Sequence, residues 1–478
     1  MDFAVRMGRP CVRNRAPTDK MSGAVFADPA AAELLLAGLS GPADVVVRLR
    51  RALARLPDPD RTLLRTVRIV SGQPPAIWSS GIEDLVRLVA LAPGSAEILL
   101  ARPELLPDLL AGDLGEGSFA PELTGAPDAA VASCRRRLNA ARLGLAAEVL
   151  SGGLPAGETG LRYTALAEAA IAGLLDVVET DYRRRHGRVA GGRFAVLALG
   201  KLGGREMTAG SDLDLVLVYD ADGLQRPSDG ARPLGAQVYF ARLANSFLAA
   251  LTARRGVETL YEIDVRLSPW ARKSAATVHR EGFCRYYDTE AWTWEHMALT
   301  RARPIAGDLS LRDRLAEQVG QVLRRRRDPA ALARDVDDMR RRIARHHAAE
   351  PPFDAKHRPG GLVDCEFVLQ FLMLREAWRA PEVLSTSSAE ATARLVAAGA
   401  LTAADGEVLR HGLRLWSGLT CLGRLTEGIA DADRRRRAIL EIAGVGEGEI
   451  EATASSVRAV YECLLAAPSP DDRPADIS

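Results

Sequence analysis

Apolar residues at helical spacing fill most of this chain, before and after one segment that has the spacing of strands. Asp28 and Pro29 open the first helical run, since aspartate caps a helix and proline fits its first turn. The same spacing continues beyond residue 308. Outside the strand segment the sequence predicts helices over residues 45–56, 82–91, 95–100, 130–150 and 161–185.

Strand patterns gather between residues 194 and 267. Phe194 to Leu199 is a short, wholly apolar run, which is typical of a buried strand. A second strand is predicted to begin at Asp212 and Asp214 and to continue through β-branched residues. Residues 256–267 alternate between apolar and polar types, which predicts a third strand with one polar face, after a helix over 236–254. The expected fold class is therefore α+β, mainly helical, with a small mixed sheet.

Composition excludes several classes of function. The chain has 478 residues, with 63 basic and 62 acidic side chains and a net charge of +1, so no global field attracts nucleic acid or an anionic membrane. Six cysteines lack the C-x-x-C spacing of a zinc site, and no apolar run is long enough to span a bilayer. We expect a cytoplasmic protein without nucleic-acid or membrane partners.

The chemistry of the sequence is concentrated in Gly210-Ser211-Asp212-Leu213-Asp214. Side chains alternate across a strand, so Asp212 and Asp214 should share one face, where they repel each other unless a cation lies between them. Mg²⁺ prefers oxygen ligands, and a carboxylate pair with substrate phosphates is typical of its sites. Gly210 and Ser211 offer backbone N–H groups and a hydroxyl to a phosphate. A solvated strand edge or a turn explains an isolated Asp-x-Asp equally well; its place on an apolar strand favours the metal.

Two further sets of residues are candidates. Asp264 and Arg266 share the polar face of the third predicted strand, where a carboxylate could join the first two and a guanidinium could hold phosphate. Spacing alone favours an ordinary surface strand there. A basic, glycine-rich stretch before a later helix predicts either a secondary anion site or a tight domain contact, and it comprises Lys356, Arg358, Gly360 and Gly361.

Three stretches carry a resemblance to a known family. G-S-D-x-D is the signature of the DNA polymerase beta-like nucleotidyltransferase superfamily, and G-K-L-G-G-R-E-M-T-x-x-S-D-L-D-L, from Gly200, closely resembles the bifunctional glutamine synthetase adenylyltransferase/adenylyl-removing enzyme family. The Met207-Thr208 pair is more similar to the C-terminal, adenylylating unit of that family. Residues 264–269 match its D-x-R-L-x-P pattern, and residues 356–367 match its K-H-R-x-G-G-L-V-D-x-E-F pattern.

The resemblance also has departures. Ser268, Trp270 and Ala271 replace the arginine and the small Ser-Gly pair that the family usually carries, which puts the approach of substrate in doubt but leaves the metal site untouched. G-S-D-x-D occurs once, whereas family members typically carry two catalytic units. We therefore expect either a separated C-terminal half or a protein that works without the deadenylylating unit.

The resemblance implies Mg²⁺-dependent transfer of AMP from ATP to a tyrosine hydroxyl of glutamine synthetase, which regulates nitrogen assimilation. Asp212, Asp214 and Asp264 would be the catalytic and metal-binding residues, with two Mg²⁺ ions, and Asp264 or a water it holds could accept the phenolic proton. The phosphate-binding set would be Gly203, Gly204, Gly210, Ser211 and Arg266.

Two other functions stay open. The chain could transfer a nucleotide to a small-molecule hydroxyl, or it could be a weakly catalytic regulatory half of a split adenylyltransferase. The signalling protein PII stays open as a second partner beside glutamine synthetase. The expected domains are a disordered leader over 1–21, a helical linker-type region over 22–158, a nucleotidyltransferase domain over 159–310, a helical bundle over 311–466 and a disordered tail over 467–478.

Overall fold

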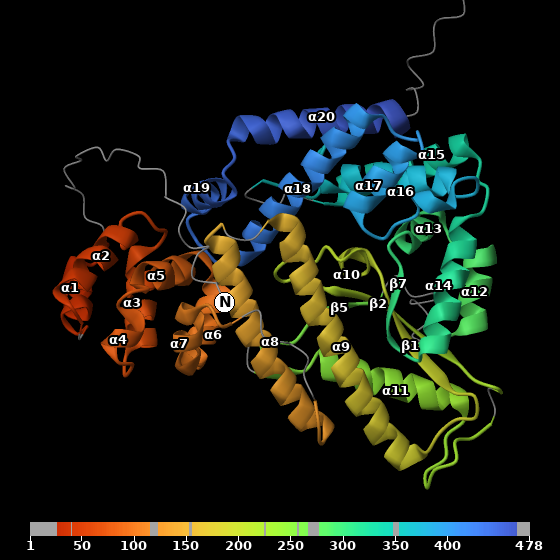
Figure 1. The fold of residues 1–478 in the computed structure, drawn as a ribbon, viewed down its shortest axis with the longest axis horizontal. Helices are drawn as coiled ribbons and strands as arrows, with labels where there is room; N and C mark the ends of the chain where they lie inside the picture. The colour runs from red at the N-terminus through yellow and green to blue at the C-terminus, as the bar shows by residue number, and fades with distance from the viewer. Residues whose placement is uncertain are drawn as a thin grey trace, which may run out of the picture.

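The computed structural model describes residues 26–39, 41–114, 123–152, 155–223, 226–255, 258–265, 277–347 and 353–465. They form a mainly helical α+β fold in which a small mixed sheet lies among helices (Figure 1). The predicted leader and tail lie outside the described residues, as do Arg266 and the departures at Ser268, Trp270 and Ala271.

Two antiparallel strands form the centre of the sheet. β1 (Arg193–Ala198) pairs with β2 (Leu213–Asp220), with Val196 opposite Leu217. Every side chain from Phe194 to Ala198 is buried, as expected for a wholly apolar strand. β7 (Arg303–Gly307) runs antiparallel on the other side of β1, while β5 (Ile263–Asp264) and β6 (Val278–His279) run parallel to β2. The first two predicted strands and the mixed sheet are confirmed.

The third predicted strand is much shorter than expected. Only Ile263 and Asp264 pair with the main sheet, whereas β4 (Glu258–Thr259) forms a separate pair with β3 (Arg254–Arg255). The neighbours Leu260 and Tyr261 are both buried, and the Arg142 guanidinium lies 4.5 Å from the centre of the Tyr261 ring. Alternation across a strand cannot bury two consecutive side chains on one face, so the alternating sequence does not make one continuous strand.

The helices that precede β1, and one that follows β2, follow the sequence pattern closely. Asp28 caps the first helix, since its carboxylate accepts a hydrogen bond of 3.0 Å from the Ala31 N–H. The long helix α9 packs against α8, α11, β7 and α18, so it connects the sheet to both helical regions. These elements are α1 (Pro29–Ala37), α2 (Ala43–Leu53), α3 (Pro59–Val70), α4 (Pro75–Trp78), α5 (Ile82–Leu91), α6 (Pro93–Ala101), α7 (Leu106–Ala111), α8 (Pro127–Leu150), α9 (Ala156–His186) and α11 (Ala236–Leu251).

A second group of helices follows β6. Those from α15 to α18, with α20, form a bundle at the top of Figure 1, while α12 and α14 lie at its right. α16 forms the centre of this bundle and is buried on nearly every side between α15, α17, α18 and α20. Across the described ranges, no helix combines the length and apolar character needed to cross a membrane. These helices are α12 (Arg280–Thr289), α13 (Thr293–Leu299), α14 (Leu309–Leu323), α15 (Pro329–His346), α16 (Leu362–Glu376), α17 (Ser388–Ala397), α18 (Ala403–Leu425), α19 (Ala432–Ala443) and α20 (Glu447–Leu465).

A buried arginine fastens the bundle to the sheet. Arg301, between α13 and β7, donates to the carboxylates of Glu206 and Glu366, the latter at 2.6 Å. Glu206 also accepts a hydrogen bond of 2.6 Å from the backbone N–H of Ser388 in α17. Burial opposes the charge of Arg301, but the two carboxylates outweigh burial and raise the pKa of Arg301 above its ordinary value. The bundle is therefore held in register with the sheet by charge as well as by packing.

Replacing Arg301 by methionine should lower the free energy of unfolding by about 3–5 kcal/mol, because it leaves the Glu206 and Glu366 carboxylates together without their cation. Chemical denaturation measures this loss. Arg410→Met is the matched control, since Arg410 is half exposed and pairs only with a neighbour on its own helix; its effect should stay within about 0.5 kcal/mol. Equal, small effects of the two substitutions would show that the buried network does not hold the bundle.

Candidate functional site

Three aspartates meet at one edge of the sheet. Asp214 is the second residue of β2, Asp212 immediately precedes that strand, and Asp264 on β5 is the register partner of Asp214. Gly200, which has φ of +52°, allows the Asp214 carboxylate to lie close to the backbone, because a β-carbon at Gly200 would lie 1.9 Å from Asp214 Oδ2. A side chain at Gly200 would therefore displace the carboxylate. The structure brings the three predicted carboxylates together.

The three aspartates give this edge of the sheet an excess of negative charge. Asp212 is exposed, whereas Asp214 and Asp264 are partly buried. Burial and repulsion from Asp264 and Asp212 raise the pKa of Asp214 to about 6, although Lys356 and Arg301 partly offset the effect. A carboxylate whose pKa is raised in this way would be stabilised by a nearby cation.

The donor set can be compared with the needs of a magnesium ion. In the part of the chain that the structure describes, no group of three or more His, Cys, Asp or Glu forms a ready-made metal cluster. Mg²⁺ is usually held by one or two carboxylates, with waters and substrate phosphates completing its shell. Asp212 and Asp214 supply oxygen donors of that kind, so the residues fit an ion that is bound together with a phosphorylated substrate.

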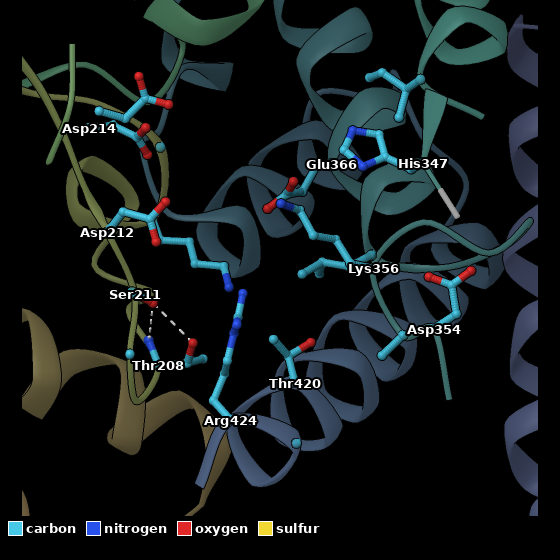
Figure 2. Close-up of a pocket in the computed structure, with 18 of the residues that line it drawn as sticks. Thr208, Ser211, Asp212, Asp214, His347, Asp354, Lys356, Glu366, Thr420 and Arg424 are labelled. Atoms are coloured by element: carbon cyan, nitrogen blue, oxygen red, sulfur yellow. Dashed lines mark hydrogen bonds between the residues drawn. The ribbon is translucent and has the colours of Figure 1, made fainter. Parts of the chain in front are cut away.

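The glycine-serine turn before β2 lies beside these aspartates. The Ser211 hydroxyl accepts a hydrogen bond of 2.9 Å from the Thr208 N–H and lies 3.0 Å from the Thr208 hydroxyl (Figure 2). Gly210 has φ of +65°, which favours glycine, and a β-carbon there would lie 4.0 Å from Arg424 Cδ of α18. Gly210 and Ser211 both line the cavity next to the aspartates.

Gly203 and Gly204 lie away from the cavity beside the aspartates. Both are buried in α10 (Gly200–Gly204) and neither lines the cavity. A β-carbon at Gly203 would lie 1.9 Å from the Arg301 carbonyl oxygen, and one at Gly204 would lie 2.2 Å from the Arg301 guanidinium. These glycines permit the close approach of Arg301, and their placement offers no surface to a phosphate.

A cleft of about 850 Å³ extends from the aspartates to the helical bundle, a size within the ~300–1,000 Å³ of small-molecule sites. Asp212 and Asp214 lie on one wall (Figure 2). Lys356 lies on the opposite wall, and Arg424 extends from α18 toward the space between the walls. Asp212 and Asp214 thus face Lys356 across the cleft, and Asp354 and Glu366 lie on the same side as that lysine.

One part of the cleft is apolar. Its side chains come from α13, α15, α16 and the segment before α16, and they are large, flat or flexible. Methionine fills irregular space and contacts aromatic rings favourably. A flat aromatic ring therefore suits this part of the cleft, which is lined by Trp294, Met297, Met339, Ile343, Phe353 and Phe367.

The residues of the basic, glycine-rich stretch before α16 have two different roles. Lys356 lines the main cleft. Arg358 instead pairs with Glu451 at 2.7 Å and lies over the Trp416 ring. Gly360 has φ of +74°, its N–H donates to Asp364 Oδ2 at 2.7 Å, and Gly361 precedes the first turn of α16. The contacts of Arg358 and Gly360 favour a domain contact over a secondary anion site for this part of the stretch. Lys356 instead lines the same cleft as the aspartates.

Lys201, Arg424 and Arg435 line the cleft and were missed in the sequence. Lys201 follows Gly200 in the glycine-punctuated loop, and Arg424 is in the last turn of α18. The lysine could have been found, because it lies inside the longest family-like stretch. The sequence around Arg424 gave no indication of a binding site, because an arginine that is followed by Thr426 and Glu427 is typical of any solvated helix end.

Known proteins resemble this sequence. Residues 82–318 match the family described as glutamate-ammonia ligase adenylyltransferase. A bifunctional glutamine synthetase adenylyltransferase/adenylyl-removing enzyme of Xanthobacter autotrophicus is 36% identical over 499 residues, which cover 95% of this chain and 50% of that protein. A protein of the same name from Bradyrhizobium sp. strain BTAi1 is 37% identical over 80% of this chain and 41% of its own length. The chain therefore spans about half the length of the curated relatives it matches.

The crowding of carboxylates can be measured directly. Without divalent cations, a ¹³C carboxyl titration by NMR should give Asp214 a pKa of about 6, so this group keeps its proton to a higher pH than an ordinary aspartate near 3.9. Asp212→Asn removes one repelling charge and should lower that pKa. A midpoint near the ordinary value in the unsubstituted protein would contradict the arrangement of the three aspartates.

Proposed function

Because the chain belongs to the glutamate-ammonia ligase adenylyltransferase family, we propose that its cleft transfers AMP from ATP to a tyrosine hydroxyl of glutamine synthetase. The observation that carries this proposal is the set of three aspartates that line a nucleotide-sized cleft, with Asp212 just before β2, Asp214 on β2 and Asp264 on β5. The two relatives are named as bifunctional glutamine synthetase adenylyltransferase/adenylyl-removing enzymes, which supports the choice of protein substrate.

We propose that Asp212 and Asp214 hold Mg²⁺, two ions per site, and that Asp264 completes the inner site. The bound metal would neutralise charge on the triphosphate and lower the pKa of the attacking phenol. Through the metal, the three aspartates would also help to orient the triphosphate for attack.

The transfer step needs a proton acceptor as well as a held phosphate. The phenolic oxygen attacks the α-phosphorus, the bond from that phosphorus to the β-phosphate oxygen breaks, and pyrophosphate leaves. Asp264, or a water it holds, takes the phenolic proton. Gly210 and Ser211 line the cleft beside the aspartates, where their N–H groups and the hydroxyl can contact a phosphate.

The remaining parts of the cleft suit the rest of the nucleotide. The apolar part between α13, α15 and α16 takes the adenine base, since flat aromatic groups gain from burial against methionine and phenylalanine. The cleft is open at its surface, which a protein substrate needs in order to present a tyrosine. Because the chain spans about half of each relative, PII and other regulators stay predictions.

The proposal predicts that Asp212→Asn/Asp214→Asn lowers transfer of label from α-labelled ATP to purified glutamine synthetase by more than about a hundredfold, because several kcal/mol of charge stabilisation depend on the metal. Asp338→Asn, an exposed aspartate of α15 outside the cleft, is the control and should leave transfer unchanged.

Chelation of divalent cations should stop the same transfer, and added Mg²⁺ should restore it. Label on a small-molecule hydroxyl and none on glutamine synthetase would move the assignment to the small-molecule alternative. ATP binding with no transfer to any acceptor would favour the regulatory half. Full activity of Asp264→Asn would contradict its role as proton acceptor and leave the metal assignment intact.

A further inference from the structure

Three cationic side chains of the cleft play no part in the chemistry described so far. Lys201 belongs to α10, Lys356 to the segment before α16, and Arg424 to the last turn of α18, and all three line the same cavity. These elements are far apart in the sequence. Their convergence is produced by the docking of the helical bundle on the sheet.

The charges of these residues are poorly neutralised by the protein. Lys201 and Lys356 form no ion pair with any residue in the described ranges. Arg424 has one contact with a carboxylate, 3.6 Å to Glu427, and its side chain is half exposed. Burial, together with repulsion from Lys356, Arg301 and Arg424, lowers the pKa of Lys201, while Glu366 acts in the opposite direction. Of the carboxylates that line the same cleft, Glu366 is already paired with Arg301 at 2.6 Å. The two lysines, which have no ion pair among the described residues, therefore keep charge that an anionic ligand could balance.

The position of Arg424 connects the two walls. Its Cδ atom would lie 4.0 Å from a β-carbon at Gly210, so its side chain reaches from α18 to the turn that precedes the aspartates. Figure 2 shows Arg424 directed toward this space and Lys356 on the far side of it. A guanidinium supplies a planar fork of donors to phosphate oxygens, and an ammonium supplies a mobile point charge.

We propose that Lys201, Lys356 and Arg424 form a polyphosphate clamp for the triphosphate of the nucleotide, with Lys201 on the same wall as the aspartates and Lys356 and Arg424 reaching in from the helical bundle. This inference rests on the proposed function for the identity of the anion. It makes the helical bundle a part of the nucleotide site, since two of the three cations come from it. The same cations would hold the pyrophosphate when its bond to the α-phosphorus breaks.

Inorganic tripolyphosphate tests the clamp without a nucleoside or a protein substrate. Isothermal titration calorimetry of the full chain with tripolyphosphate and Mg²⁺ should show about tenfold weaker binding for Lys356→Ala and for Arg424→Ala, since a charge-assisted hydrogen bond contributes about 1.5–3 kcal/mol. The double variant should bind about a hundredfold more weakly. Lys356 and Arg424 are exposed, so these variants should fold, which thermal unfolding verifies.

Arg414→Ala is the matched control, because Arg414 is an exposed arginine on the same helix, outside the cleft. Its affinity for tripolyphosphate should stay within twofold of the unsubstituted protein. Adenosine, which has no phosphate, should bind all variants alike. Unchanged tripolyphosphate affinity in the double variant would overturn the clamp, as would an equal loss of adenosine binding.

Failure of the clamp and failure of the proposed function give different results. If the unsubstituted protein binds tripolyphosphate through Lys356 and Arg424 but transfers no AMP to glutamine synthetase, the clamp stands and the protein substrate is wrong. If AMP transfer is intact in the double variant and tripolyphosphate affinity is unchanged, the function stands and the clamp is wrong.

Discussion

The buried guanidinium of Arg301 determines where the two walls of the cleft stand. It lies between Glu206, next to the loop that leads to the aspartates, and Glu366 on α16. A buried charge destabilises the fold unless its partners stay in place, so this triplet fixes the bundle against the sheet. Gly203 and Gly204 lack side chains where Arg301 passes. The residues that hold the fold together thus adjoin the residues proposed to hold the nucleotide.

Charge is separated across the cleft that this contact creates. Asp212 and Asp214 repel each other on one wall, while Lys356 on the opposite wall and Arg424 beside the space between them have few protein partners. A polyanion that carries divalent cations would satisfy both sets of charges, since its metals face the carboxylates and its remaining oxygens face the lysine and arginine. Such a ligand would relieve the repulsion of Asp212 and Asp264 on the Asp214 carboxylate.

Local patterns predicted the features that depend on neighbouring residues. The strands β1 and β2, the Asp28 cap and the shared edge of the aspartates follow from strand alternation and helix capping. Local alternation failed where tertiary packing buries both Leu260 and Tyr261. The role of Gly203 could not be read from its motif, because its partner comes from a distant segment. Arg424 lies on a helix with no distinguishing pattern, and only the docking of the bundle brings it to the cleft.

Anomalous diffraction from crystals of the chain with Mn²⁺ and a non-hydrolysable ATP analogue would test the central claim most directly. The account predicts manganese peaks beside the carboxylates of Asp212 and Asp214, with the triphosphate between them and Lys356 and the adenine among the apolar side chains of α13, α15 and α16. A nucleotide bound elsewhere, or manganese without contact to either aspartate, would contradict the account.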